Sequence, residues 1–396
     1  MRKCLSLLFL FLISNVFSQE NEYFIDANFD VNNRLVEIYQ TIDFTNTTSN
    51  SLNYIILNDW AHSYSNPKTP LGKRLSEDFT LNFQRSTKNQ RGFTNIIHIK
   101  SDSIILEHTR LKVNIDLVKV KLSNALKPNQ KIRINIKYNI KIPISDFTGY
   151  GIDKENNINL SEWFITLAKV VDNDWLIESN LDLNDNSLDP SFYKFKITYP
   201  LKFKLISDFK IDSVITSDTF KTLISEKEKR IYNPIIITNK KSFESFKLKN
   251  NTVITDIGNI KKNKTDSLIY KVISYVDNKT GNKLISKPDS NDSLNFDLIL
   301  NKTFNYVESK LGIYPINNMV LSKFNQDKDP VYGLNNIPEL LNPFDNTFIQ
   351  EFSVLKLVIS SYLNNLYPIH KRKNYWQLKG IEVFLLIDYI EKYYPE

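Results

Sequence analysis

The sequence is poor in the residues that build disulfides, thiolate metal sites and phosphate-binding loops. It contains one cysteine, Cys4, and nine glycines among 396 residues. Because Cys4 lies in an N-terminal stretch that we expect to be removed, the exported chain is predicted to have neither a disulfide nor a cysteine-bound metal. A chain of this length can form a core that is stable without disulfides. The few glycines leave little material for a glycine-rich phosphate loop.

Histidine is scarce as well. The four histidines are His62, His98, His108 and His370. No two of them have the spacing of paired metal ligands, and His370, in YPIHKRKNY, is predicted to be an exposed loop residue rather than a ligand. The acidic run 182–189 lacks the glycine and the closing glutamate of a calcium loop, so we expect a solvated acidic turn there. We identify no Ser-His-Asp arrangement.

The first eighteen residues have the pattern of a secretory signal peptide. Arg2 and Lys3 precede a mostly apolar run that is too short to span a bilayer. Val16 and Ser18 are small enough for a cleavage site before Gln19. We therefore expect a protein exported to the periplasm or the extracellular space, with no transmembrane segment after cleavage.

No charge pattern indicates a nucleic-acid partner. The formal net charge is +7, and it is spread over many Lys, Asp and Glu residues. No basic cluster with interleaved aromatic residues is present, which argues against nucleic-acid binding.

From Tyr23 to about Glu244, short alternating runs broken by turn residues predict a large antiparallel all-β region. The predicted strands are 24–31, 35–46, 52–59, 94–101, 111–117, 131–142, 193–200 and 233–239. Residues 60–92 and 143–192 are predicted to be long irregular connections.

The C-terminal part has a different pattern. One or two further strands are expected at 254–258 and 268–276, and a helix is expected to start near Asp297 and end at Gly312. Two more helices are predicted. The first has its apolar residues on one face, namely Phe352, Leu355, Ile359, Tyr362, Leu363 and Leu366. The second, 378–394, is apolar almost all round, which is typical of an interior helix.

Four segments, in this order and register, resemble the aminopeptidase N family of zinc metallopeptidases (gluzincins). They are 25–66, 160–180, 311–324 (LGIYPINNMVLSKF) and 330–340 (PVYGLNNIPEL). The resemblance implies a multidomain fold, β and then α/β: an N-terminal antiparallel β-sandwich followed by a partial thermolysin-like catalytic domain. The expected division is 1–18 signal peptide, 19–244 β-sandwich and 245–396 truncated gluzincin-like domain, since the family continues beyond the position of Glu396.

The family binds zinc through H-E-x-x-H and a glutamate eighteen residues later, which is the metal-ligand spacing of two adjacent helices. Laid on this sequence from Trp376-x-x-x-Gly380, the third ligand falls on Lys379 and the second on Ser360. The first ligand then falls on Lys356 and the general base on Leu357. In the family's substrate-binding loop, the matching residues are Gly333, Leu334, Asn335 and Asn336, with Asn335 in place of the glutamate that binds a substrate's amino terminus.

The resemblance therefore implies a degenerate, non-catalytic member without zinc, a pseudoenzyme that binds a peptide or protein. Lys356 is either solvated or placed on the floor of the cleft. Glu382 lies one helical turn after Lys379 and is the expected internal carboxylate partner for these lysines. Glu351 is a further candidate. Two alternatives stay open: part of an active zinc-dependent peptidase completed by missing sequence or a partner, and a product without function.

Overall fold

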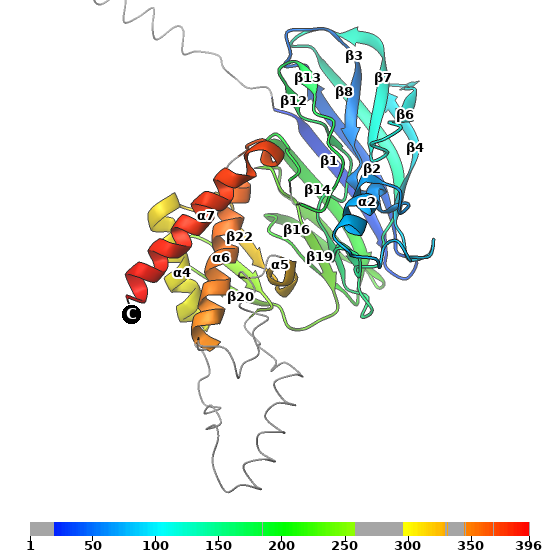
Figure 1. Ribbon diagram of the computed structural model, residues 1–396. Helices are drawn as coiled ribbons and strands as arrows, with labels where there is room; N and C mark the ends of the chain where they lie inside the picture. Colours follow the sequence, from blue (N-terminus) through cyan, green and yellow to red (C-terminus); the bar gives the residue numbers. More distant parts are fainter. Residues whose placement is uncertain are drawn as a thin grey trace, which may run out of the picture.

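The computed structural model describes residues 20–183, 185–257, 296–328, 331, 344, 346–366 and 368–395. A β-rich half is followed along the chain by a helical half, and the two lie side by side (Figure 1). Each half has its own hydrophobic core, one formed between residues 23 and 237 and the other between residues 253 and 389. The predicted strand 268–276 lies outside the described residues.

The largest sheet has nine strands, in the order β16-β17-β14-β1-β2-β8-β4-β5 with β18 beside β14. The strands are β1 (Glu22–Asp30), β2 (Leu35–Thr45), β4 (Phe93–Ser101), β5 (Ile104–Ile105), β8 (Lys131–Lys141), β14 (Ser191–Pro200), β16 (Ile211–Thr216), β17 (Phe220–Ser225) and β18 (Glu228–Arg230). All neighbours pair antiparallel except β1 and β14, which run parallel. The predicted antiparallel β region is confirmed apart from this pair.

Two four-stranded sheets and a short hairpin complete the β-rich half. One sheet contains β15 (Lys204–Ile206), β19 (Ile235–Thr238), β10 (Ile158–Leu160) and β9 (Gly151–Ile152). The other contains β11 (Thr166–Leu167), β3 (Leu52–Asn58), β7 (Leu117–Leu126) and β6 (His108–Arg110). The hairpin pairs β12 (Val170–Val171) with β13 (Asp174–Trp175).

Successive side chains of a strand point to opposite faces of the sheet, and the sequence follows this period. In β1, Tyr23, Ile25, Ala27 and Phe29 are buried, whereas Phe24 and Asn28 between them are exposed. This alternation is the pattern from which the strand was predicted.

Three parts of the β prediction are wrong. The connection 143–192, predicted to be irregular, contains the short strands β9 to β13. The predicted connection 60–92 contains a 3₁₀ helix, η1 (Trp60–Tyr64), and the helix α2 (Pro70–Glu77), which Thr69 caps through a hydrogen bond from the Gly72 amide. The predicted strand 111–117 is mostly a turn, closed by the Leu117 amide donating to the Asn114 carbonyl at 2.9 Å. Local hydrogen bonds outweigh the apolar alternation in that segment.

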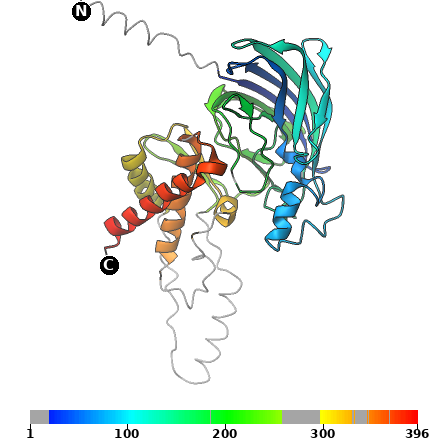
Figure 2. The same cartoon turned by 45° about the horizontal axis from the view of Figure 1, so that its top comes forward.

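In the part of it that the structure describes, the helical half combines a small sheet with four helices. Its sheet contains β20 (Glu244–Lys247), β21 (Thr252–Thr255) and β22 (Asn318–Leu321). Its helices are α4 (Phe296–Leu311), α5 (Lys323–Lys328), α6 (Asn346–Leu366) and α7 (Lys371–Tyr393). The predicted helix end at Gly312 is confirmed, since this glycine follows α4 with a φ of +85°. Figure 2 shows α4, α6 and α7 gathered on one side of the β-rich half.

The last helix differs from the prediction in length and burial. α7 begins at Lys371, seven residues before the predicted start, because His370 caps it. It is also not an interior helix. One side buries Leu378, Leu385 and Tyr389. The opposite side exposes apolar residues, namely Trp376, Val383, Phe384 and Ile387. Among the described residues, no helix is long and apolar enough to cross a membrane.

Candidate functional site

Four residues, Lys356, Leu357, Ser360 and Lys379, align with the family's zinc ligands and general base and are called the family positions here. Two of them form hydrogen bonds with the same carboxylate. Ser360, on α6, donates its hydroxyl to Glu382 Oε2 at 2.9 Å. Lys379, on α7, places its ammonium 3.0 Å from Glu382 Oε1 and 2.9 Å from Oε2. The predicted pairing of Lys379 with Glu382 is therefore confirmed. Glu382, whose side chain is 3% exposed, joins the two helices at the positions aligned with zinc ligands.

Lys356 and Leu357 lie one turn before Ser360 on the same helix. Lys356 is 2% exposed, so the solvated alternative for this lysine is wrong. A lysine is rarely buried so fully, and periodicity alone did not predict it. The other suggested carboxylate, Glu351, instead accepts from Lys302 Nζ at 2.6 Å and from the Tyr389 hydroxyl. The predicted substrate-loop residues 333–336 lie outside the described residues.

These side chains do not fit zinc. A zinc ligand must offer a lone pair, and the carboxylate of Glu382 is already engaged by Lys379 and Ser360. In the ranges that the structure describes, no group of three His, Cys, Asp or Glu side chains could hold a metal. The arrangement is an ion pair within α7, and a hydrogen bond from Ser360 connects it to α6.

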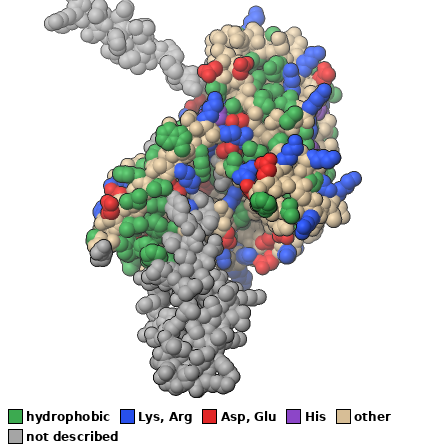
Figure 3. Space-filling model, viewed as in Figure 1, with side chains coloured by type: hydrophobic (Ala, Val, Ile, Leu, Met, Phe, Trp, Pro, Cys, Tyr) green, Lys and Arg blue, Asp and Glu red, His purple; other side chains and the backbone are tan. Residues whose placement is uncertain are grey.

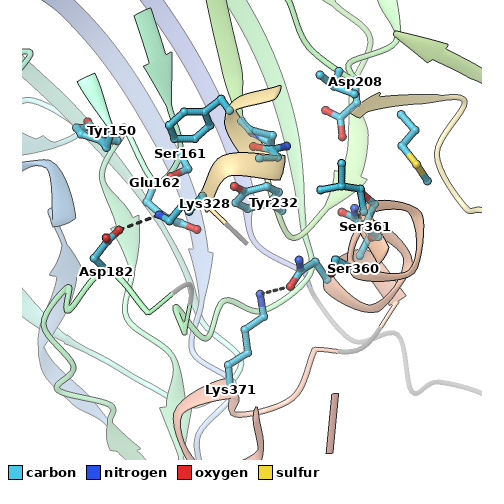
Figure 4. A pocket seen from close by; sticks show the side chains of 18 of the residues that line it. Tyr150, Ser161, Glu162, Asp182, Asp208, Tyr232, Lys328, Ser360, Ser361 and Lys371 are labelled. Atoms are coloured by element: carbon cyan, nitrogen blue, oxygen red, sulfur yellow. Dashed lines mark hydrogen bonds and ion pairs between the residues drawn. The ribbon is translucent and has the colours of Figure 1, made fainter. Parts of the chain in front are cut away.

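A cavity of about 140 Å³ lies beside this pair, between the β-rich half and α6 (Figure 4). The side chains of α6 that line it include Leu357, Ser360 and Asn364. The β-rich half contributes acidic and aromatic side chains, and the start of α7 contributes Lys371. The cavity therefore borders two of the family positions, Leu357 and Ser360.

Two of the acidic side chains in the cavity wall are neutralised by basic partners. Asp182 pairs with Lys328 Nζ at 2.8 Å. Asp208 pairs with Arg230, whose side chain is 1% exposed and which also donates to Asn233 Oδ1 at 3.0 Å. These groups hold the wall together and leave little net charge in the cavity.

Glu162 and Lys371 also line this cavity, and they bring a carboxyl group and an ammonium group to it. Glu162 accepts from Asn186 Nδ2 at 2.7 Å, and burial raises the pKa of its carboxyl. Lys371 donates to Asn364 Oδ1 at 3.1 Å, and burial lowers the pKa of its ammonium. Within the described ranges no ion pair joins Glu162 to Lys371, so each keeps hydrogen-bonding capacity for a third group.

The acidic run 182–189 is not the solvated turn that the sequence predicts. Asp185 is buried and accepts from Arg372 Nε at 2.6 Å, and Arg372 also donates to the Ser179 carbonyl at 2.8 Å. His370, predicted to be exposed, has a side chain only 11% exposed and lies 3.7 Å from Glu178. The run and the start of α7 form a polar contact between the two halves, which single-sequence patterns could not reveal.

A buried cluster next to Trp60 in the cavity wall gives a pH-dependent prediction. Burial, together with the nearby Arg110, lowers the pKa of His62 to about 3. Burial raises the pKa of Asp59 to about 6, although Arg110 lies 2.6 Å away. Each group therefore changes its proton uptake on folding, and the two changes have opposite signs.

We expect the variant His62→Gln to be less sensitive to acid than the natural chain. Between about pH 6.5 and 3 the unfolded chain binds a proton that folded His62 does not, so stability is lost as the pH falls through this window. The unfolding equilibrium should shift by up to about tenfold per pH unit relative to the variant. Asp59 is present in both proteins and cancels in the comparison. Urea unfolding of both from pH 7 to pH 5 measures this, and parallel curves would contradict it.

The comparisons with known proteins agree with this architecture at the level of fold. No protein-family model matches the sequence, and no curated protein matches it. The M1 zinc metallopeptidase from Deinococcus radiodurans superposes with a TM-score of 0.53 at 11% identity, covering 94% of this chain and 71% of that chain. A mutant of that enzyme bound to a Tyr-Ser-Ala substrate gives a TM-score of 0.51 at 10% identity, with coverages of 94% and 72%.

At such low identity the likeness shows the fold alone. It confirms the predicted fold class, a β domain followed by part of a catalytic domain. The chain thus has a metallopeptidase-like fold that resembles the M1 (aminopeptidase N) family.

Proposed function

We propose that this protein is an exported, non-catalytic relative of the M1 metallopeptidases that binds a peptide without hydrolysing it. The observation that carries the proposal is the ion pair at the family's metal position. Ser360 and Lys379, aligned with two ligands, are both bonded to Glu382.

Catalysis in the family needs a metal-activated water and a general base. An ammonium at Lys379 cannot donate an electron pair to zinc, and the alkyl side chain of Leu357 cannot accept a proton. One altered ligand can be replaced by a neighbouring group. Loss of all three ligand positions together with the base leaves no catalytic part on α6 and α7.

The cavity favours a peptide as the ligand class. Glu162 can accept a hydrogen bond from an amide or an ammonium, and Lys371 can donate one to a carbonyl or a carboxylate. Tyr150 and Tyr232 line the same cavity with aromatic surface. A few polar groups set among aromatic walls are typical of small-ligand sites. The resemblance to peptidases suggests the same class, since the printed ligand of one neighbour is Tyr-Ser-Ala.

The test uses the full chain expressed with its own leader. We expect substoichiometric zinc by elemental analysis after zinc exposure, no chelator-sensitive hydrolysis of peptides, and calorimetric binding of Tyr-Ser-Ala that Lys371→Met weakens. Lys68→Met, at an exposed lysine outside the cavity, is the matched control. Stoichiometric zinc, or hydrolysis abolished by a chelator, would overturn the proposal in favour of an active peptidase completed by other sequence. Equal binding of the peptide by both variants would show that the cavity is not the binding site.

A further inference from the structure

Lys371 is a buried cation that lines the cavity and is bonded only to a neutral group. The residue is 7% exposed, and its ammonium donates to the amide oxygen Oδ1 of Asn364 at 3.1 Å. In the part of the chain that the structure describes, no carboxylate forms an ion pair with it. Burial lowers the pKa of this ammonium, and the nearby charges of Glu162 and Asp185 offset that effect only in part.

Two neighbouring cations are each matched with a carboxylate. Lys328, which lines the same cavity, lies 2.8 Å from Asp182. Arg372, the next residue along the chain, lies 2.6 Å from Asp185. A buried charge normally has such a partner, because its transfer out of water is costly. Lys371 can therefore bind an anion that the described residues do not supply.

The Lys371 side chain is held in place before any ligand arrives. The backbone amide of Lys371 donates to Ser187 Oγ at 3.0 Å, which fastens the start of α7 to the β-rich half. Figure 4 shows the side chain reaching from the start of α7 toward the part of the cavity that carries Glu162 and Tyr232. A group that is already ordered loses little conformational freedom on binding. In the space-filling view (Figure 3), both halves present mixed charges at the surface, so the buried position distinguishes Lys371 from the many exposed lysines.

The cavity has room for the end of a peptide rather than for a chain that passes through it. Its volume is about 140 Å³, close to the roughly 150 Å³ of a protein cavity that holds one benzene molecule. A segment that entered and left would need more space than a single residue occupies. Tyr150 and Tyr232 in the wall can pack against one side chain. The anion that a peptide carries at its end is the C-terminal carboxylate.

We propose that Lys371 binds the C-terminal carboxylate of the peptide, so that the cavity accepts peptides whose C-terminus is free. This inference rests on the proposed peptide-binding function and specifies which end of the peptide is buried. An ammonium and a carboxylate form a charge-assisted hydrogen bond, which is about twice as strong as a bond between neutral groups. A backbone carbonyl would accept a hydrogen bond from Lys371 but would not balance its charge.

Calorimetry of the full chain with Tyr-Ser-Ala and with its C-terminal amide tests this, since the two peptides differ only in the carboxylate. We expect the natural chain to bind the acid about 10- to 100-fold more tightly than the amide. Lys371→Met should bring the two affinities to within about twofold. Lys371→Gln, which keeps a donor for Asn364 without the charge, should do the same. N-acetyl-Tyr-Ser-Ala and its amide are the matched control pair, because they lack the ammonium and should keep the preference for the acid.

Each other result contradicts the inference. Equal affinities of the natural chain for acid and amide overturn it and leave the proposed peptide binding standing. A preference for the acid that survives both Lys371 variants overturns it as well, because another group then binds the carboxylate. Tyr-Ser-Asp amide has its only carboxylate in a side chain, and binding as tight as that of the Tyr-Ser-Ala acid would show that the terminus is not what is recognised. Absence of binding by all these peptides overturns the proposed function together with this inference.

Discussion

The variant Lys356→His, Ser360→His, Lys379→Glu should bind zinc, whereas we expect the natural chain not to retain it. Positions 356 and 360 are one helical turn apart on α6, so two histidines there would share one face. Ser360 and Lys379 already meet on Glu382, so a glutamate at 379 would approach the same point. Three such ligands form a typical zinc set, and assembled zinc sites contribute about 10 kcal/mol or more of binding free energy.

Elemental analysis after dialysis, and the absorption spectrum with cobalt as a substitute, measure the engineered site. The matched control is Lys356→His, Ser361→His, Lys379→Glu, in which the second histidine is moved by one residue and points about 100° away around the helix. We expect stoichiometric metal in the first variant and little in the control. If both variants fold and neither holds zinc, positions 356, 360 and 379 do not correspond to the family's ligands.

The variant Asp208→Ala should lower the free energy of unfolding by about 3–5 kcal/mol. Asp208 and Arg230 form an ion pair whose side chains are only 7% and 1% exposed. Removing the carboxylate leaves a guanidinium buried without its charge partner, and the contacts to Asn233 and Glu228 compensate only in part. Because Asp208 lines the cavity, the same change should loosen its wall.

Chemical denaturation measures this loss of stability, and an exposed ion pair serves as the comparison. Glu155 and Lys240 lie 2.9 Å apart, but their side chains are 67% and 42% exposed. The variant Glu155→Ala should therefore cost less than about 1 kcal/mol. The combined variant Asp208→Ala, Arg230→Met should recover part of the loss, because no buried charge is left without a partner. Equal effects of Asp208→Ala and Glu155→Ala would show that burial does not determine how much the Asp208–Arg230 pair contributes to stability.

Several features of the candidate site could be predicted from the sequence because they depend on local spacing. Glu382 lies three residues after Lys379 on one helix, and this spacing brings the two side chains together whatever surrounds them. The end of α4 at Gly312 is local in the same sense, since the left-handed conformation there favours glycine. Alternation along β1 likewise predicts a strand from its own residues.

The cavity and the contact between the halves could not be predicted in this way. Glu162 and Lys371 are separated by about half the chain, and no periodicity links two polar residues in different halves. Asp185 and His370 read as surface residues because their types are usually exposed. Asp185 is buried and His370 is largely covered, because Arg372 and the start of α7 pack against the acidic run.

The sequence by itself determined that a β-rich region precedes a helical one, and it determined that lysine, leucine and serine stand where the resembling family has ligands and base. Those properties follow from residue identity and short-range spacing. The tertiary structure alone decided that Lys356 is buried, that Ser360 and Lys379 share Glu382, and that one face of α7 is exposed among the described residues. These depend on which surfaces distant segments bring together, because burial is a property of the packed molecule and not of any one segment.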